Sequence, residues 1–146
     1  MWRPQPLPND ILKLYLEAAR LAGVDDYEVE EGTLCAVANR YYKGDAIGWH
    51  ADNETLFGEV ESSKVLSISL GAAMQFEVRR KKDGETISST WLESGDVFYM
   101  SRAQKETEHR ALALTGDGRR INVTFRFVKR HHQQCGCSVT ALAGGC

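Results

Sequence analysis

Seven short runs of alternating or apolar residues follow Asp25, bounded by Gly, Asp and Asn. Runs of this length and composition are typical of β-strands. We predict strands at 33–41, 64–70, 74–80, 86–92, 96–100, 110–114 and 120–128. This many short strands in one chain predicts a mainly β fold, as a sandwich, a jelly roll or a barrel.

One helix is predicted ahead of the strands, over residues 10–22. Its apolar residues recur at helical spacing, at Ile11, Leu12, Tyr15, Ala18, Ala19 and Ala22. We expect Asn9 to cap the start, because its side chain can accept a free N–H of the first turn. Gly23 is expected to end the helix, because glycine readily adopts the left-handed conformation found there.

The composition predicts a single globular domain. Of 146 residues, 42% are hydrophobic and 26% are charged, which excludes collagen-like and disordered chains. No apolar run approaches the roughly 20 residues of a membrane-spanning helix. We predict a domain over residues 1–130 and a flexible tail over 131–146. Residues 1–9 do not resemble a signal peptide, so we expect a cytoplasmic or nuclear protein with reduced cysteines.

Positive charge gathers late in the chain. Residues 1–60 hold 5 basic and 11 acidic residues, whereas residues 101–130 hold 8 basic and 3 acidic ones. The cationic segment either meets an anionic partner, such as nucleic acid or a small polyacid, or is a solvated surface. The basic run 79–82 precedes the turn signal Asp83-Gly84. It is either a solvated hairpin end or a phosphate contact.

The last predicted strand, 120–128, has one polar and one apolar face. Alternate side chains of a strand point to opposite faces. One face therefore carries Arg120, Asn122, Thr124 and Arg126, and the other carries Ile121, Val123, Phe125 and Phe127. The polar face either meets solvent or lines the mouth of a barrel, where two arginines could hold a dianion through paired hydrogen bonds.

A candidate metal site lies in His50-Ala51-Asp52, where an imidazole and a carboxylate stand two residues apart. Two histidines and one carboxylate form the facial triad that holds non-haem Fe(II) and leaves positions open for other ligands. His109 is the only histidine between His50 and the tail. It is either the third ligand or a surface residue among charged neighbours. The aromatic residues Trp49, Trp91, Phe76 and Phe98 are expected in the core.

Taken together, these features resemble the AlkB-type Fe(II)- and 2-oxoglutarate-dependent dioxygenases. The resemblance covers residues of roughly 33 to 128, and its matching segments are 39–44, 47–54, 67–71 with Phe76, 92–97, His109 and 120–126. It implies a double-stranded β-helix, which is a jelly-roll barrel, with one N-terminal helix. Residues 1–130 then form the dioxygenase domain. The 38 residues before Asn39 are fewer than the usual N-terminal lid of the family, so we expect a shortened lid.

The resemblance also implies the roles of individual residues. His50, Asp52 and His109 match the Fe(II) ligands and catalytic centre. Glu54 matches an acidic position near the substrate base, while Asn53 stands where close relatives often have a carboxylate.

Five further positions match contacts to the cosubstrate. Arg120 matches the arginine that pairs with the distal carboxylate of 2-oxoglutarate. Arg126 matches a second arginine that positions the cosubstrate and the carboxylate ligand. Asn39, Tyr41 and Asn122 match polar positions beside it. The residues alone favour a structural interpretation, with Asn39 as a turn residue and Tyr41 as a buried aromatic.

The activity implied by the resemblance is oxidative demethylation of N-methylated nucleobases in DNA or RNA. We expect a preference for single strands, because a short lid leaves little machinery for flipping a base out of a duplex. Alternatives are a dioxygenase with a protein substrate and a non-catalytic barrel that binds nucleic acid. The tail offers a zinc site as an alternative to flexibility, with candidate ligands His131, His132, Cys135, Cys137 and Cys146.

Overall fold

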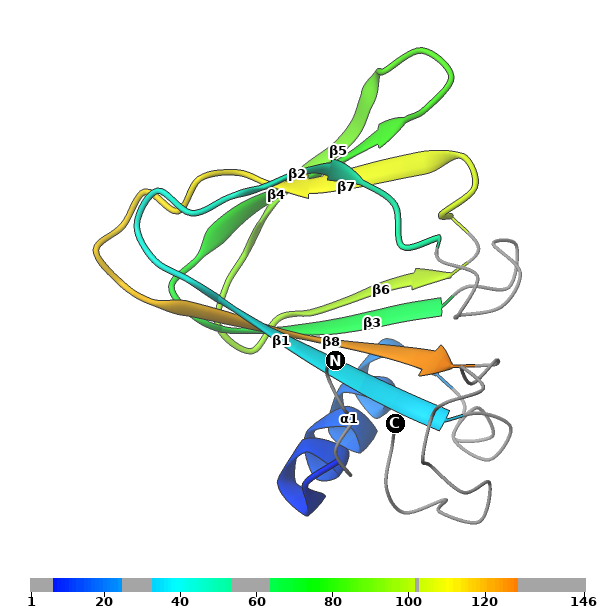
Figure 1. The fold of residues 1–146 in the computed structure, drawn as a ribbon, viewed down its shortest axis with the longest axis vertical. Helices are drawn as coiled ribbons and strands as arrows, with labels where there is room; N and C mark the ends of the chain where they lie inside the picture. The colour runs from blue at the N-terminus through cyan, green and yellow to red at the C-terminus, as the bar shows by residue number, and fades with distance from the viewer. Residues whose placement is uncertain (1–6, 25–32, 54–63, 102, 129–146) are drawn as a thin grey trace, which may run out of the picture.

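The structure is a computed structural model that describes residues 7–24, 33–53, 64–101 and 103–128 (Figure 1). Three predictions fall outside these residues: the shortened lid in part, the substrate contact Glu54, and the tail 131–146 with its candidate zinc ligands. Within the described residues, no helix has the length and apolar character needed to cross a membrane.

Helix α1 spans Asn9–Ala22, within one residue of the prediction. Gly23 ends it as expected, in the left-handed conformation with φ 66°. The prediction that Asn9 caps the helix is wrong. Pro8 holds the cap position, with no side-chain hydrogen bond, and its carbonyl accepts the amides of Ile11 and Leu12. The helix therefore begins one residue earlier, and Asn9 already belongs to its first turn.

Eight strands are described, and they form two antiparallel sheets of four. Their bounds are β1 (Thr33–Tyr41), β2 (Ile47–His50), β3 (Lys64–Gly71), β4 (Met74–Arg80), β5 (Thr86–Leu92), β6 (Val97–Ser101), β7 (Thr107–Ala111) and β8 (Arg120–Val128). The sheet orders are β1-β8-β3-β6 and β2-β7-β4-β5. The sheets face each other, and the chain passes repeatedly from one to the other (Figure 1). This is the double-stranded β-helix, or jelly roll, that the resemblance to the AlkB-type dioxygenases implied.

Two strand predictions differ from the structure. Strand β2 was not predicted, because it has only four residues, contains Gly48, and pairs with β7 through an irregular register. The strand predicted at 110–114 is displaced, because β7 ends at Ala111. Beyond it the amide of Leu114 donates to the carbonyl of Asp45, so these apolar residues belong to a connection. The displacement places His109 inside a strand.

The main hydrophobic core lies between α1 and the outer face of the β1-β8-β3-β6 sheet (Figure 1). Its buried members are Tyr15, Ala18, Ala19, Leu34, Leu66, Ile68, Val123 and Phe125. Because side chains alternate along β8, this packing turns the polar face of β8 toward the space between the sheets. The predicted division of β8 is confirmed for its described side chains, and Arg120, Asn122, Thr124 and Arg126 line one pocket there.

The basic run 79–82 is built into the hairpin between β4 and β5. The hairpin turns at Gly84, where φ is 73°. Three of the four basic side chains have partners within the protein. Arg79 pairs with Glu108 at 2.8 Å, Arg80 pairs with Asp83 at 3.3 Å, and Lys81 donates to the carbonyl of Gln104 at 2.8 Å. These contacts favour a structural role over a phosphate contact.

Trp49 packs on the outer face of the second sheet rather than in a core. The guanidinium groups of Arg79 and Arg110 lie 4.3 and 4.5 Å from its ring centroid. Since β2 pairs with its neighbour at few residues, these contacts add support to a short edge strand.

The expectation that Trp91 is a core residue is wrong. It lies on the edge strand β5 and is 53% exposed.

We predict that Trp49→Leu lowers the free energy of unfolding by about 1 to 3 kcal/mol, because it removes two cation–π contacts and aromatic packing area. Trp91→Leu is the matched control on the same sheet, and it should change stability by less than about 0.5 kcal/mol. Chemical denaturation of both variants measures the difference. Equal losses would show that Trp49 does not anchor β2.

Candidate metal centre

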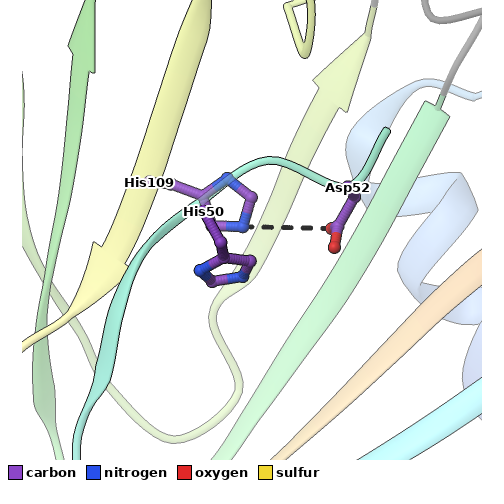
Figure 2. A group of neighbouring side chains, drawn as sticks. All are labelled: His50, Asp52 and His109. Atoms are coloured by element: carbon purple, nitrogen blue, oxygen red, sulfur yellow. Dashed lines mark ion pairs between the residues drawn. The ribbon is translucent and has the colours of Figure 1, made fainter. Parts of the chain in front are cut away.

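Three potential metal ligands meet between the two sheets. His50 ends β2, Asp52 follows two residues later, and His109 stands in the middle of β7 (Figure 2). Antiparallel pairing places His50 directly opposite His109, and their ring centroids are 4.2 Å apart. One ligand atom from each residue lies within 4.8 Å of the others. The predicted triad is therefore assembled by the register between β2 and β7 and by the turn that follows β2.

The imidazole of His50 is held by its own strand. Its Nδ1 lies 2.8 Å from the carbonyl oxygen of Gly48, and a carbonyl can only accept a hydrogen bond. Nδ1 is therefore the protonated nitrogen. In the metal-binding form of the ring, Nε2 is then the nitrogen that carries the lone pair, as is usual for metal-binding histidines.

His109 is buried, with 5% of its surface exposed. Burial, followed by the proximity of His50, lowers the pKa of His109 to about 4, although Asp52 acts in the opposite direction. The ring is therefore neutral near pH 7, which is the form that binds metals. Its Nε2 lies 3.9 Å from Oδ2 of Asp52 (Figure 2), and the ring of Phe76 stacks on it at 5.5 Å.

Asp52 is the anionic member of the group and is 4% exposed. Its Oδ1 accepts a hydrogen bond of 2.6 Å from Nη2 of Arg126 on β8. Its main-chain N–H donates to Oε1 of Gln104 at 3.0 Å. The carboxylate is thus compensated on one side by a cation, while Oδ2 is directed toward His109. A buried carboxylate without such a partner would be strongly destabilising.

A pocket joins this centre to the residues predicted to bind the cosubstrate. Its lining includes Asn39, Tyr41, Arg120, Asn122 and Arg126 together with the three potential metal ligands. The predicted residues that lie in the described part of the chain are therefore brought together. Tyr41 stands opposite Arg120, and Asn39 opposite Asn122, in the β1–β8 ladder. Burial raises the pKa of Tyr41, so its hydroxyl stays protonated near pH 7.

Arg120 is a buried cation, with 4% of its surface exposed. It donates to Oγ of Ser69 at 2.6 Å and to the carbonyls of Leu92 and Ala72 at 2.9 and 3.4 Å. These partners are neutral, and no carboxylate of the described residues forms an ion pair with it. Burial lowers its pKa, which still leaves the guanidinium charged near pH 7. The pocket therefore offers an anion a positive charge that has no direct ion-pair partner among the described residues.

Asn122 carries an unsatisfied polar atom. Its Nδ2 donates to Oγ1 of Thr124 at 3.1 Å, and its Oδ1 is buried without a hydrogen-bond partner. The two ends of an amide have the same shape, so a half-turn of the group lets Thr124 donate to Oδ1. Nδ2 then faces the unsatisfied position as a donor. Such a donor suits a carboxylate oxygen.

The donor set and its surroundings fit Fe(II) and 2-oxoglutarate. Two neutral imidazoles and one carboxylate are the ligands of the non-haem Fe(II) triad. Arg120, with its neutral hydrogen-bond partners, and the unsatisfied amide of Asn122 fit a dicarboxylate. Within the pocket, these residues would hold the iron at one end and the cosubstrate beside it.

Sequence reasoning missed Gln104, which touches Asp52, and the hydroxyl of Ser69, which touches Arg120. Gln104 stands in a polar segment between two strands, where nothing in the sequence distinguishes it from a solvated turn residue. Ser69 alternates with Ser67 along β3. That alternation could have suggested a second polar inward face.

Comparison with known proteins agrees with this chemistry. The model of the 2OG-Fe(II) oxygenase superfamily matches residues 3–126. The chain therefore belongs to the 2OG-Fe(II) oxygenase superfamily, and Fe(II) and 2-oxoglutarate are its cofactor and cosubstrate. Its curated relatives narrow this membership to the AlkB type.

Several of these relatives bear AlkB names. The "DNA oxidative demethylase ALKBH2" of Arabidopsis thaliana is 26% identical over 113 residues, which cover 60% of this chain and 35% of that protein. The human "Alpha-ketoglutarate-dependent dioxygenase alkB homolog 3" is 28% identical over 90 residues, which cover 62% and 28% of the two chains. The chain thus spans about a third of the length of these relatives.

A viral protein is also similar. The "RNA replication protein" of Grapevine virus A (isolate Is 151) is 31% identical over 87 residues, which cover 60% of this chain and 5% of that protein. Among solved structures, recombinant oxalate oxidase in complex with glycolate covers 65% of this chain and 42% of its own, at 10% identity and a TM-score of 0.48. Because this likeness is weak, the assignment of the chain to the double-stranded β-helix fold rests on the order and pairing of its strands.

We predict that His109→Ala and Asp52→Ala both weaken Fe(II) binding by more than about 100-fold, since each removes a ligand and loss of a mere supporting partner already costs roughly 10- to 100-fold. Anaerobic Fe(II) titration measures the affinity. Glu108→Gln changes a carboxylate on the opposite face of β7 and should leave the affinity unchanged. Unaltered binding in His109→Ala would remove that residue from the centre.

Proposed function

We propose that this chain is an Fe(II)- and 2-oxoglutarate-dependent dioxygenase that removes N-methyl groups from the bases of nucleic acid. One observation carries the proposal. A half-buried histidine, a buried histidine and a buried carboxylate share a pocket with a buried arginine that has no ion-pair partner among the described residues. A metal site and an anion site in one pocket are what an oxygenase with an acidic cosubstrate requires.

In this proposal His50, Asp52 and His109 hold the iron. The Gly48 carbonyl accepts a hydrogen bond from Nδ1 of His50 and so directs Nε2 toward the metal, and burial keeps His109 neutral. Arg126 limits the movement of Asp52 by binding one of its oxygens. The other oxygen is the one that binds the metal in this proposal.

Arg120 binds the distal carboxylate of 2-oxoglutarate in the same proposal. A guanidinium can bind a carboxylate through two parallel hydrogen bonds, and its present neutral partners fix its orientation. Asn39, Tyr41 and Asn122 support the cosubstrate from neighbouring positions of β1 and β8. Arg126 contributes a second positive charge on the iron side.

Bound Fe(II) and 2-oxoglutarate supply oxidative chemistry, in which dioxygen converts the cosubstrate to succinate and carbon dioxide and hydroxylates a substrate C–H bond. Hydroxylation of an N-methyl group yields an unstable product that releases formaldehyde. The residues of the pocket bind and orient the reacting groups. Glu54, predicted near the substrate base, lies outside the described residues and remains part of the proposal.

A nucleic acid substrate is supported by two relatives whose names specify DNA demethylation and RNA replication.

A single strand is the preferred form in this proposal. The described aromatic residues of the pocket, Tyr41, Phe76 and Phe98, are buried or half-buried. The exposed Tyr42 and Trp91 do not line it. The described residues thus offer no exposed aromatic at the pocket to replace a flipped base, which costs a few kcal/mol to extrude from a duplex.

We predict that Arg120→Ala raises the concentration of 2-oxoglutarate needed for half-maximal turnover, because it removes a charge-assisted pair worth about 2 to 5 kcal/mol. Arg120→Lys should restore only part of the affinity, since an ammonium lacks the planar fork. Arg119→Ala is the control, because this neighbour is exposed. Steady-state assays that vary cosubstrate and oligonucleotide separately test the assignment. An equal effect on both requirements would contradict it.

The activity itself is tested by following formaldehyde and succinate with a panel of methylated oligonucleotides, single-stranded and annealed. We expect faster demethylation of the single strand, and weaker binding at higher salt because phosphate contacts release counterions. Asp52→Ala is the inactive control. Faster turnover of the duplex would reject the single-strand preference.

Two other outcomes would redirect the function. If 2-oxoglutarate is consumed but no oligonucleotide is demethylated, the substrate is of another class, such as a protein side chain. If the chain binds oligonucleotides and consumes no 2-oxoglutarate with Fe(II) bound, it is a non-catalytic binding barrel.

A further inference from the structure

Gln104 is a fully buried polar residue next to the metal centre. It lies in the turn between β6 and β7, five residues before His109, and only 1% of its surface is exposed. A buried amide needs hydrogen-bond partners for its donor and its acceptor. The identity of these partners indicates what the residue does.

Both ends of the Gln104 amide are engaged. Oε1 accepts the main-chain N–H of Asp52 at 3.0 Å, and Nε2 lies 3.7 Å from the sulfur of Met100. The main-chain carbonyl of Gln104 accepts a hydrogen bond from Nζ of Lys81 at 2.8 Å. Gln104 is therefore fixed on three sides, by β6, by the β4–β5 hairpin and by the segment that carries Asp52.

The bond to Asp52 occurs where the strand ladder no longer holds the chain. The last paired residue of β2 is His50, and residues 51–53 have no regular secondary structure. The Asp52 amide is thus bound by a side chain from a distant part of the sequence. Leaving a buried amide without an acceptor is costly, so this contact constrains where the Asp52 main chain can lie.

We propose that Gln104 is a positioning residue for the metal centre. It ties the main chain of Asp52 to the turn that leads directly into His109, and so fixes two metal ligands relative to each other. Arg126 fixes the Asp52 carboxylate, whereas Gln104 fixes the backbone behind it. Lys81 in turn holds Gln104, which gives one residue of the basic run 79–82 a part in the same arrangement. The proposal rests on the metal centre described above and not on the substrate.

Two variants separate positioning from packing. Gln104→Met has a similar volume but no acceptor for the Asp52 amide. Gln104→Glu keeps an acceptor oxygen in either protonation state. We expect Gln104→Met to weaken Mn(II) binding by about 10- to 100-fold, as loss of a partner of a metal ligand usually does, and Gln104→Glu to retain most of the affinity. Mn(II) replaces Fe(II) in the titration and is followed by electron paramagnetic resonance.

Hydrogen exchange of the Asp52 amide gives a second readout, which needs neither metal nor activity. This exchange should be faster in Gln104→Met than in the unmodified protein. Leu66→Ala, which opens a cavity in the helix-covered core, is the control for a general loss of stability. At a matched fall in melting temperature, it should bind Mn(II) normally.

A further pair of variants tests the outer contact. Lys81→Met removes the hydrogen bond to the Gln104 carbonyl and should weaken Mn(II) binding less than Gln104→Met does. Lys82→Met is its control, because Lys82 is exposed and forms no hydrogen bond or ion pair among the described residues.

Three results would overturn the proposal: native Mn(II) affinity in Gln104→Met, equal weakening in Gln104→Met and Gln104→Glu, or the same weakening in Leu66→Ala. Failure of the unmodified protein to bind Mn(II) would instead reject the metal centre. Absence of demethylation would leave these binding measurements unaffected.

Discussion

The carboxylate of Asp52 is buried between two sheets, and the rest of the site depends on keeping it there. A buried charge is strongly unfavourable unless it is paired and hydrogen-bonded. Here Arg126 supplies the compensating charge, and two other parts of the chain lie against Asp52. Arg126 of β8 binds Oδ1 at 2.6 Å, His109 of β7 approaches Oδ2, and Gln104 accepts the main-chain amide. The two sheets must close on each other to bring these groups together.

The net charge of the pocket also favours binding of the metal and the cosubstrate together. Among the described residues that line it, two arginines face one carboxylate, and His109 is neutral near pH 7. A dication alone would add to this excess of positive charge. A dication together with a dianion leaves the balance unchanged. The pocket is therefore electrostatically suited to hold Fe(II) and 2-oxoglutarate at the same time, with the dianion nearer Arg120 and the cation nearer Asp52.

The sequence predicted the parts of the site that follow from alternation along a long strand. In β8 an apolar face packs under α1, so the described polar residues from Arg120 to Arg126 had to face inward. Short or irregular segments were beyond this reasoning. Strand β2 has four residues and an irregular register, and β7 ends three residues before its predicted limit. The third ligand, His109, could be assigned only by resemblance, because charged neighbours obscure its inward direction.

Tertiary contacts explain the remaining differences. Gln104 is buried only because the β6–β7 turn folds over Asp52, and no local sequence pattern indicates this contact. Trp91 is exposed because β5 is an edge strand, although the large apolar area of a tryptophan side chain favours burial. Asn9 does not cap the helix, because Pro8 holds the cap position and the helix begins one residue earlier than predicted. In each case the difference from the prediction comes from residues distant in the sequence, or from a helix start that is displaced by one residue.

The most direct test of the account is a crystal structure grown without oxygen in the presence of Fe(II) and 2-oxoglutarate, with anomalous scattering recorded at the iron edge. The account predicts one iron peak bonded to Nε2 of His50, a carboxylate oxygen of Asp52 and Nε2 of His109, with a carboxylate of 2-oxoglutarate on Arg120. An iron peak away from these three residues, or 2-oxoglutarate bound without contact to Arg120, would contradict it.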